Sequence, residues 1–183
     1  MDAAEAVFGQ KGYEQASIAE ITQKAGVALG TFYVYFPDKK TLFVETVDNL
    51  GRRLRTELSE AIEGRPDRFE VEEAGIRAFL AFVRRHKLLY RVVRQAEFVD
   101  PDCFRRYYEN LAIPYARGLE EAMRAGQVRK IDPEGLAWIL MGLSDYLGMR
   151  YVLWGGRRSA DDTVALAVDF IRRGIEPSHR SKS

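Results

Sequence analysis

The sequence predicts an all-α protein of about nine helices. Apolar residues recur at helical spacing along most of its 183 residues, and no stretch alternates apolar and polar side chains for long enough to favour a strand. Capping residues, glycines and prolines divide this pattern into segments. A composition of 46% hydrophobic and 30% charged residues is that of an ordinary globular protein with a sizeable core.

The first two helices are predicted within residues 1–25. Ala4, Val7 and Phe8 recur at helical spacing, and Gly12 is expected to end the first helix. Ser17 precedes Glu20 by three residues, which predicts a reciprocal capping box at the start of the second helix. The apolar stripe of this second helix comprises Ile18, Ile21 and Ala25.

A third helix is expected over residues 28–35, after a short turn. Gly26 can adopt a positive φ at little cost, and Val27 is expected to pack between the two helices. Pro37 ends the third helix because proline cannot donate the next hydrogen bond. Asp38 is placed to cap a fourth helix, which continues to about Ile62.

The later part of the chain contains further start and stop signals. Asp100-Pro101, Asp132-Pro133 and Ser159 with Asp162 each mark a helix start. Helices are predicted at about 67–84, 87–97, 101–125, 133–154 and 160–174. The clearest linker is GRPD at 64–67, and we place a functional boundary near residue 50. The predicted division is an N-terminal domain over 1–50, a helical domain over 51–175 and a disordered tail over 176–183.

Composition bears on the class of protein. The 28 basic and 27 acidic residues nearly cancel, so net charge gives no sign of nucleic-acid affinity. The single Cys103 leaves no partner for an intramolecular disulfide, and the N-terminus has no export-signal pattern, so we expect a cytoplasmic protein. Residues 136–154 approach the length of a membrane span, but Asp145 and Arg150 favour a helix buried by protein.

Residues 17–40 carry the strongest functional signal. Four aromatic rings, those of Phe32, Tyr33, Tyr35 and Phe36, surround more than one face of a short helix. Phe32 and Phe36 suit the core, which turns Tyr33 outward. Tyrosine hydroxyls, Thr31, the backbone near Gly30 and Lys39 are groups that contact DNA phosphates and base edges. The pattern favours a DNA-binding helix-turn-helix, with an aromatic-rich core helix as the alternative.

Four sequence elements between Phe8 and Phe43 make this interpretation specific. They are G-Y-x-x-A-S, I-A-x-I-x-x-x-A-G-V, G-T-F-Y-x-Y-F and K-x-x-L-F. Their spacing resembles the DNA-binding domain of the TetR family of bacterial transcriptional regulators. The resemblance implies a three-helix DNA-binding domain, a C-terminal helical ligand-binding and dimerisation domain, and a homodimeric repressor that a small molecule releases from a palindromic DNA operator.

The resemblance also implies which residues contact DNA. Ser17 falls where the second helix meets a phosphate, and Lys39 falls on the phosphate-contacting position of the fourth helix. The recognition helix carries Leu29, Gly30, Thr31, Tyr33, Val34 and Tyr35. Leu29 and Val34 are apolar where base-contacting members of the family often carry polar groups, so they would contact thymine methyl groups or fill space.

The charge of the N-terminal region departs from the family pattern. Family members usually carry a basic arm before the first helix, whereas residues 1–50 here hold four lysines, no arginine and seven acidic residues. Fewer phosphate contacts lower the affinity and flatten its salt dependence. We expect a basic arm ahead of these residues or, as the less favoured alternative, contributions from dimerisation and from Arg52, Arg53 and Arg55.

The last two helices are expected to pair with a second copy of the chain. The segment 136–154 is apolar around its whole circumference, and the last helix is apolar on two faces, so both need cover on several sides. A symmetric four-helix interface provides this cover, and the family places its interface there; a monomeric core helix is the alternative. The predicted interface residues are Met149, Trp154, Val164, Val168 and Ile171.

The C-terminal domain has more aromatic residues than a plain core needs, which predicts an apolar pocket with a polar end. The predicted ligand-binding residues are Phe82, Phe98, Tyr107, Tyr108, Trp138, Met141 and Asp145. Asp145 needs a partner, which could be an arginine such as Arg94 or Arg117, a group across the dimer, or the ligand. Arg84, Arg85, Arg91 and Arg94 would suit the acidic head group of an acyl-coenzyme A, although a solvated basic face is the simpler explanation.

An enzyme is not predicted. The sequence has no HExxH motif, nucleophile elbow or phosphate-binding loop, and no histidine lies near Cys103 in the sequence. We expect no cofactor and no metal. The alternative function is that of a helical ligand-binding or scaffold protein whose DNA binding is weakened or lost.

Overall fold

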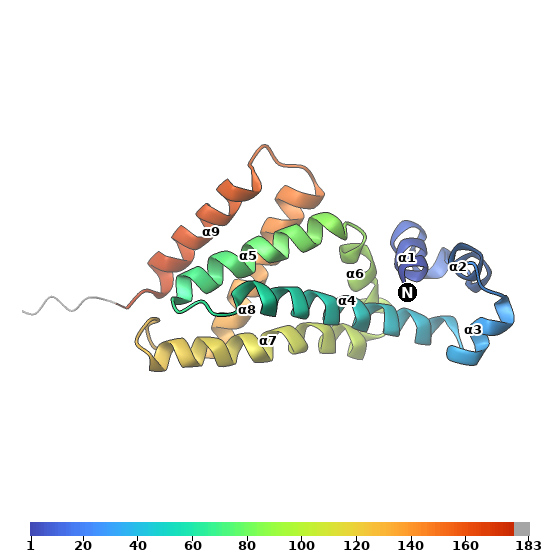
Figure 1. Ribbon diagram of the computed structural model, residues 1–183, viewed down its shortest axis with the longest axis horizontal. Coiled ribbons are helices and arrows are strands. Elements are labelled where there is room, and N and C mark those ends of the chain that lie inside the picture. Colours follow the sequence, from blue (N-terminus) through green and yellow to red (C-terminus); the bar gives the residue numbers. More distant parts are fainter. Residues whose placement is uncertain (178–183) are drawn as a thin grey trace, which may run out of the picture. The chain divides into compact units, whose positions relative to one another are not determined.

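The computed structural model describes residues 1–177, and this part of the chain is helical (Figure 1). Its α-helices are α1 Asp2–Gln15, α2 Ile18–Ala25, α3 Leu29–Tyr35, α4 Lys39–Ile62, α5 Arg68–Arg85, α6 Leu89–Val99, α7 Pro101–Arg124, α8 Pro133–Gly148 and α9 Ala160–Ile175. No strand occurs in the described part, so the predicted all-α fold is confirmed. Most of the expected disordered tail, residues 178–183, lies outside the described residues.

The chain divides into two compact units. The first contains Met1–Arg53 and His86–Glu109, and the second contains Leu54–Arg85 and the chain from Asn110 onwards. Helices α4 and α7 each supply residues to both units. The first unit therefore joins α1–α3 to α6, which follows them only after a long intervening segment.

The predicted caps form at several helix starts. Ser17 Oγ accepts a hydrogen bond from the Glu20 backbone N–H at 3.2 Å. The Glu20 carboxylate pairs with Lys11 Nζ at 2.8 Å, so it is drawn toward α1 and away from the reciprocal capping bond that the sequence suggested. The side chains of Asp38, Asp100, Asp132 and Ser159 accept backbone hydrogen bonds from Thr41, Cys103, Gly135 and Asp162 in the same way.

Two helix ends differ from the prediction. Gly12 has a φ of 84°, as a helix-ending glycine should, but helical structure resumes and α1 continues to Gln15. The helix predicted over 133–154 ends at Gly148 and passes into a π-helical turn, Met149–Leu153. A helical hydropathy pattern cannot distinguish α-helical from π-helical hydrogen bonding, because both keep the chain coiled.

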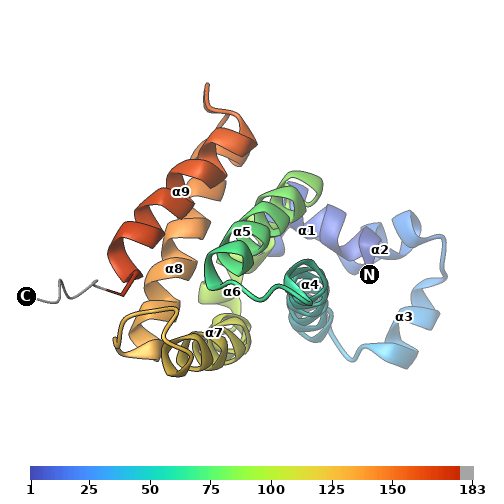
Figure 2. The ribbon, with the colours of Figure 1, turned by 60° about the vertical axis from the view of Figure 1, so that its left-hand side comes forward.

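The core of the second unit lies between α5, α7, α8 and α9, and Figure 2 shows α5, α8 and α9 next to one another. Helix α9 contributes a stripe at helical spacing: Val164, Ala167, Ile171 and Ile175. Helix α8 contributes Leu136, Ala137 and Leu140. No described helix combines the length and the apolar character needed to cross a bilayer.

A buried polar network joins α5 to α7 beside this core. Arg68 Nε and Nη2 donate to Glu72 Oε1 at 2.8 and 2.5 Å, and the Tyr115 hydroxyl donates to Glu72 Oε2 at 2.5 Å. Arg68 and Glu72 are almost fully buried. Burial, and then the nearby Glu72 carboxylate, raise the pKa of Tyr115 well above its usual value, so the hydroxyl stays a donor.

Removing one member of this network should destabilise the second unit. We expect Glu72→Ala to lower the free energy of unfolding by about 3–5 kcal/mol, because it leaves the Arg68 charge buried without its partner. Glu73→Ala is the matched control, since Glu73 pairs with Arg77 at 3.0 Å across one exposed helical turn and should cost about 0.5 kcal/mol or less. Denaturant unfolding measures both. Equal losses would contradict a special role for the buried pair.

Candidate nucleic-acid interface

Aromatic packing fixes α1 against α4 in the first unit. Phe8 and Phe43 are fully buried, and their ring centroids lie 5.1 Å apart in an edge-to-face contact. The Tyr13 ring makes a similar contact with Phe43 at 5.1 Å. Such pairs stabilise a core beyond the area they bury. They provide a rigid base for the two short helices between α1 and α4.

The turn between α2 and α3 has helix-turn-helix geometry. Gly26 adopts a left-handed conformation with a φ of 69°, and the Val27 N–H donates to the Thr22 carbonyl at 3.0 Å. The predicted packing of Val27 between the helices is wrong, because its side chain is 46% exposed. Backbone hydrogen bonds shape the turn, and Phe32, which is 5% exposed, anchors α3.

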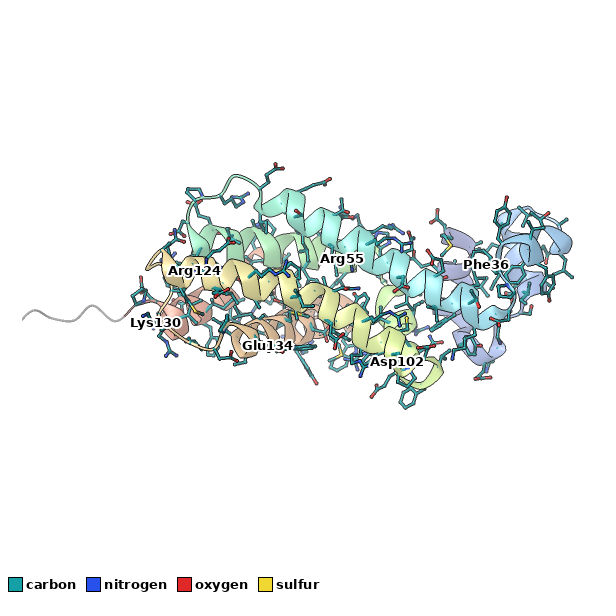
Figure 3. The ribbon with its side chains drawn as sticks, turned by 90° about the horizontal axis from the view of Figure 1, so that it is seen from below. Phe36, Arg55, Asp102, Arg124, Lys130 and Glu134 are labelled. Atoms are coloured by element: carbon teal, nitrogen blue, oxygen red, sulfur yellow. The ribbon has the colours of Figure 1, made fainter. Side chains whose placement is uncertain are left out.

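Helix α3 presents its remaining side chains to solvent. Val34 is 77% exposed and Tyr35 is 73% exposed, and Leu29, Gly30, Thr31 and Tyr33 are also exposed. Side chains project on several sides around the labelled Phe36, which follows α3 (Figure 3). Ser17, at the start of α2, is exposed as well. The seven predicted contact residues on α2 and α3 are thus accessible to a partner.

Lys39 has an unexpected environment. Its ammonium donates to the backbone carbonyls of Tyr13, Glu14 and Ala16 at 2.8, 3.3 and 3.1 Å, and it lies 4.5 Å from the centroid of the Tyr13 ring. These carbonyls follow the Gly12 break in α1. Lys39 therefore ties the start of α4 to the end of α1. The phosphate contact predicted for it stays a prediction, and its charge already has acceptors within the chain.

Other basic groups of the first unit are also engaged internally. Lys40 Nζ pairs with the Asp100 carboxylate at 3.1 Å, which raises the pKa of Lys40, and Lys11 pairs with Glu20. Arg52 and Arg53, expected to support phosphate binding, pair with Glu45 at 2.7 Å and Glu5 at 3.2 Å. A phosphate would have to compete with these carboxylates for them.

Sequence reasoning missed the attachment of α6 to α1. Gln95 Oε1 accepts a hydrogen bond from the Tyr13 N–H at 2.5 Å, and Gln95 Nε2 donates to the Phe8 carbonyl at 3.4 Å. Gly9 lies so close to Leu88 that an added Cβ would come within 2.4 Å of the leucine Cβ. A small residue in the middle of an apolar stripe is the only signal that could have indicated this contact.

The predicted ligand-binding residues fall in both units. Phe98, Tyr107 and Tyr108 belong to the first unit, where the last two have ring centroids 5.2 Å apart. Phe98 is 86% exposed. In the second unit Phe82 is buried, Trp138 is exposed, and Met141 and Asp145 are half-buried. Their ligand-binding role stays a prediction. Within the described residues no group of histidine, cysteine and acidic side chains could hold a metal ion.

The predicted dimer residues separate into two groups. Val164 and Ile171 are 1% and 2% exposed in the core of the second unit, so the structure corrects their assignment to a partner interface. Val168 packs against the same core, and Met149 is half-buried. Trp154 is exposed. Sequence periodicity showed two apolar faces on α9 but could not tell which one points inward.

Cys103 is a buried thiol, an environment that does not favour a nucleophile. It is fully buried, and burial is the main cause that raises its pKa to about 11. The thiol is therefore protonated at neutral pH, and the thiolate is the reactive form.

Comparison with known proteins agrees with this geometry. Residues 1–46 match the family described as bacterial regulatory proteins, tetR family. Residues 1–46, which contain α1, α2 and α3, are therefore those of a TetR-family DNA-binding domain. This confirms the resemblance inferred from the four sequence elements, and it places the exposed α3 within a transcriptional regulator.

Relatives of similar length extend the likeness beyond the first unit. The chain is 26% identical to the HTH-type transcriptional regulator YdgC of Bacillus subtilis (strain 168) over 90% of this chain and 83% of that protein. It is 27% identical to the HTH-type transcriptional regulator BetI of Serratia proteamaculans (strain 568) over 93% and 88%. The structure of the transcriptional regulator FadR from Bacillus subtilis in complex with stearoyl-CoA has the same fold, with a TM-score of 0.80 at 22% identity over 96% and 97%. These relatives are transcriptional regulators.

The role of Lys39 can be tested against that of Lys24. Both substitutions to Met remove one positive charge, but Lys24 is exposed on α2 whereas Lys39 is bonded to three carbonyls. We expect Lys39→Met to lower the free energy of unfolding by about 1–3 kcal/mol, since the carbonyls lose a charged donor, and Lys24→Met to change it by about 0.5 kcal/mol or less. Denaturant titration followed by circular dichroism measures this. If Lys39→Met left the free energy of unfolding unchanged, the contact between Lys39 and the three carbonyls would not be stabilising.

Proposed function

We propose that the protein is a ligand-responsive repressor that binds a palindromic DNA operator as a homodimer in the cytoplasm. The observation that carries this proposal is the exposed surface of α3. Phe32 is the one buried side chain of this helix, and the others face solvent. A recognition helix inserts into the major groove, so its base-contacting side chains must be accessible in the free protein. The predicted contacts are Ser17, Leu29, Gly30, Thr31, Tyr33, Val34, Tyr35 and Lys39.

A homodimer is supported by the outer surface of α8 and α9. Ile139 and Tyr146 on α8 are 63% and 66% exposed, and they are seven residues apart, which places them on one side of the helix. On α9, Leu166 and Phe170 are exposed on the side away from the core stripe. Exposed apolar patches of this kind mark protein–protein contacts. We therefore move the proposed interface to this surface. Of the interface residues predicted from the sequence, we retain Trp154, which is exposed.

Glycines on the same surface allow helices to approach closely. Gly142 lies between Ile139 and Tyr146, and Gly174 lies four residues after Phe170. A Cβ added at either glycine would meet nothing within 4 Å, so neither is required by contacts inside the chain. A symmetric pairing of α8 and α9 with the same helices of a second copy would cover both positions.

An acyl-type small molecule is the proposed effector class. The FadR structure contains stearoyl-CoA, and that protein has the same fold over nearly the whole chain. To release the operator, the effector must bind one conformation of the dimer better than the other, because equal affinity would shift no population.

DNA binding is tested by gel shift with the protein's own upstream region. We expect Tyr35→Ala to lower affinity by about tenfold or more, because one base or phosphate contact in each half-site is lost in the dimer. Arg124→Ala, an exposed position in the second unit, is the control and should bind normally. Failure of the wild-type protein to bind any promoter fragment would favour the alternative, a helical ligand-binding protein without DNA binding. The internal pairing of Lys11, Lys39 and Lys40 is the observation in favour of that alternative.

The interface is tested by introducing a charge. We expect Phe170→Glu and Trp154→Glu each to convert a dimer into a monomer at micromolar concentration, because each substitution would bury a carboxylate from both copies in the proposed apolar interface. Phe98→Glu is the matched control, since Phe98 is an even more exposed phenylalanine in the other unit. Light scattering after size-exclusion chromatography gives the mass. A monomeric wild type, or dimers in all three variants, would overturn the proposed interface.

A further inference from the structure

We propose that Gly30 and Val34 form one contact surface on α3 that recognises the C5-methyl group of a thymine in the major groove. This inference rests on the proposed DNA-binding function and adds the base feature that the helix detects. In this proposal α3 distinguishes thymine from other bases by apolar contact and by close approach of its backbone, and its hydroxyl groups contribute less.

Gly30 has no explanation inside the chain. A Cβ added there would meet nothing within 4 Å, and its φ is not positive, so alanine would fit without strain. Glycine also weakens a helix relative to alanine. By contrast, Gly26 needs its left-handed conformation and Gly9 needs the space beside Leu88. A glycine that the fold does not require, on an exposed helix, allows another molecule to approach the backbone.

Val34 lies on the same side of α3 as Gly30. The two residues are four apart, so they are neighbours on the helix surface, and Phe32 anchors a different side. Val34 is the most exposed of the apolar side chains on α3, at 77%. A β-branched side chain holds few rotamers, so it loses little conformational entropy when it is placed against a partner. The pair presents an open backbone next to a stiff apolar group.

The chemistry of α3 leaves few other ways to distinguish bases. Its sequence, LGTFYVY, contains no Arg, Lys, Asn, Gln, Asp or Glu, which are the side chains that make bidentate or charged contacts with base edges. Its polar groups are the hydroxyls of Thr31, Tyr33 and Tyr35. In the major groove the thymine methyl is the apolar feature that marks a base pair. Val34 can contact that methyl only if the helix lies close to the base edges, which Gly30 permits.

The internal pairing of the lysines agrees with this mode of recognition. Lys11, Lys39 and Lys40 all have acceptors within the first unit, so the long-range attraction to phosphates is reduced. Affinity must then depend more on short-range contacts at the groove floor.

The test uses a duplex selected from a randomised pool by binding to the wild-type protein. Each thymine is replaced in turn by deoxyuridine, which removes the methyl group and keeps base pairing. We expect one thymine in each half-site at which the replacement lowers affinity about fourfold, the value for losing one buried methyl group. Replacement in both half-sites should lower it about sixteenfold. At that position Val34→Ala should bind thymine and deoxyuridine duplexes equally well.

The Gly30→Ala substitution should change the melting temperature and the affinity for DNA in opposite directions. We expect its melting temperature to rise by about 1–3 °C, because alanine favours the helix, while its affinity for the selected duplex falls. Val34→Ala should leave the melting temperature within about 1 °C, since the side chain is exposed. If Gly30→Ala kept the wild-type affinity for the selected duplex, the proposed close approach of the α3 backbone to the bases would be wrong.

Different outcomes test the DNA-binding function and the recognition of the methyl group. If the protein selects no duplex from the pool, the proposed DNA-binding function is wrong. If a duplex is selected but every deoxyuridine replacement leaves affinity unchanged, or Val34→Ala keeps the wild-type preference for thymine, only the methyl recognition by Val34 is wrong.

Discussion

The contact between the Lys39 ammonium and the carbonyls that end α1 is the constraint on which the first unit depends. The Gly12 break leaves the carbonyls of Tyr13, Glu14 and Ala16 turned toward α4, and the lysine satisfies them together. Because charged donors make the stronger hydrogen bonds, this single side chain holds two helix ends in place. The short helices α2 and α3 connect α1 to α4 along the chain, and α2 packs against both α1 and α3.

This arrangement has a consequence for recognition. Cations that stabilise the unit internally are less available to phosphates, while the side chains of α3 that face outward are aromatic, aliphatic or hydroxyl-bearing. Stability of the first unit and affinity for DNA therefore draw on the same few charges. A DNA-binding regulator built in this way would gain specificity from contact surface and, in the proposed dimer, would gain affinity from two linked binding sites.

In the second unit, α9 has one apolar face in the core and another that is exposed. One side of α9 fills the core with Val164 and Ile171, and the other exposes Leu166 and Phe170. The Arg68–Glu72–Tyr115 network fastens α5 to α7 with every buried polar side-chain atom of the described residues satisfied. The outer surface of α8 and α9 lies outside this core, so the proposed pairing would require no repacking of the interior.

The sequence by itself determined the all-α fold, nearly all helix boundaries and the helix-turn-helix, because caps, Gly26, Pro37 and apolar periodicity act over a few residues. It also determined which residues of α2 and α3 are candidates for DNA contact. Only the tertiary structure decided that Gln95 and Leu88 meet α1, that Lys39 is held by carbonyls, that Val27 is exposed, and which face of α9 points inward. The reason is physical: these outcomes depend on packing between residues far apart in sequence, and helical periodicity is the same whether a face meets its own core or a partner.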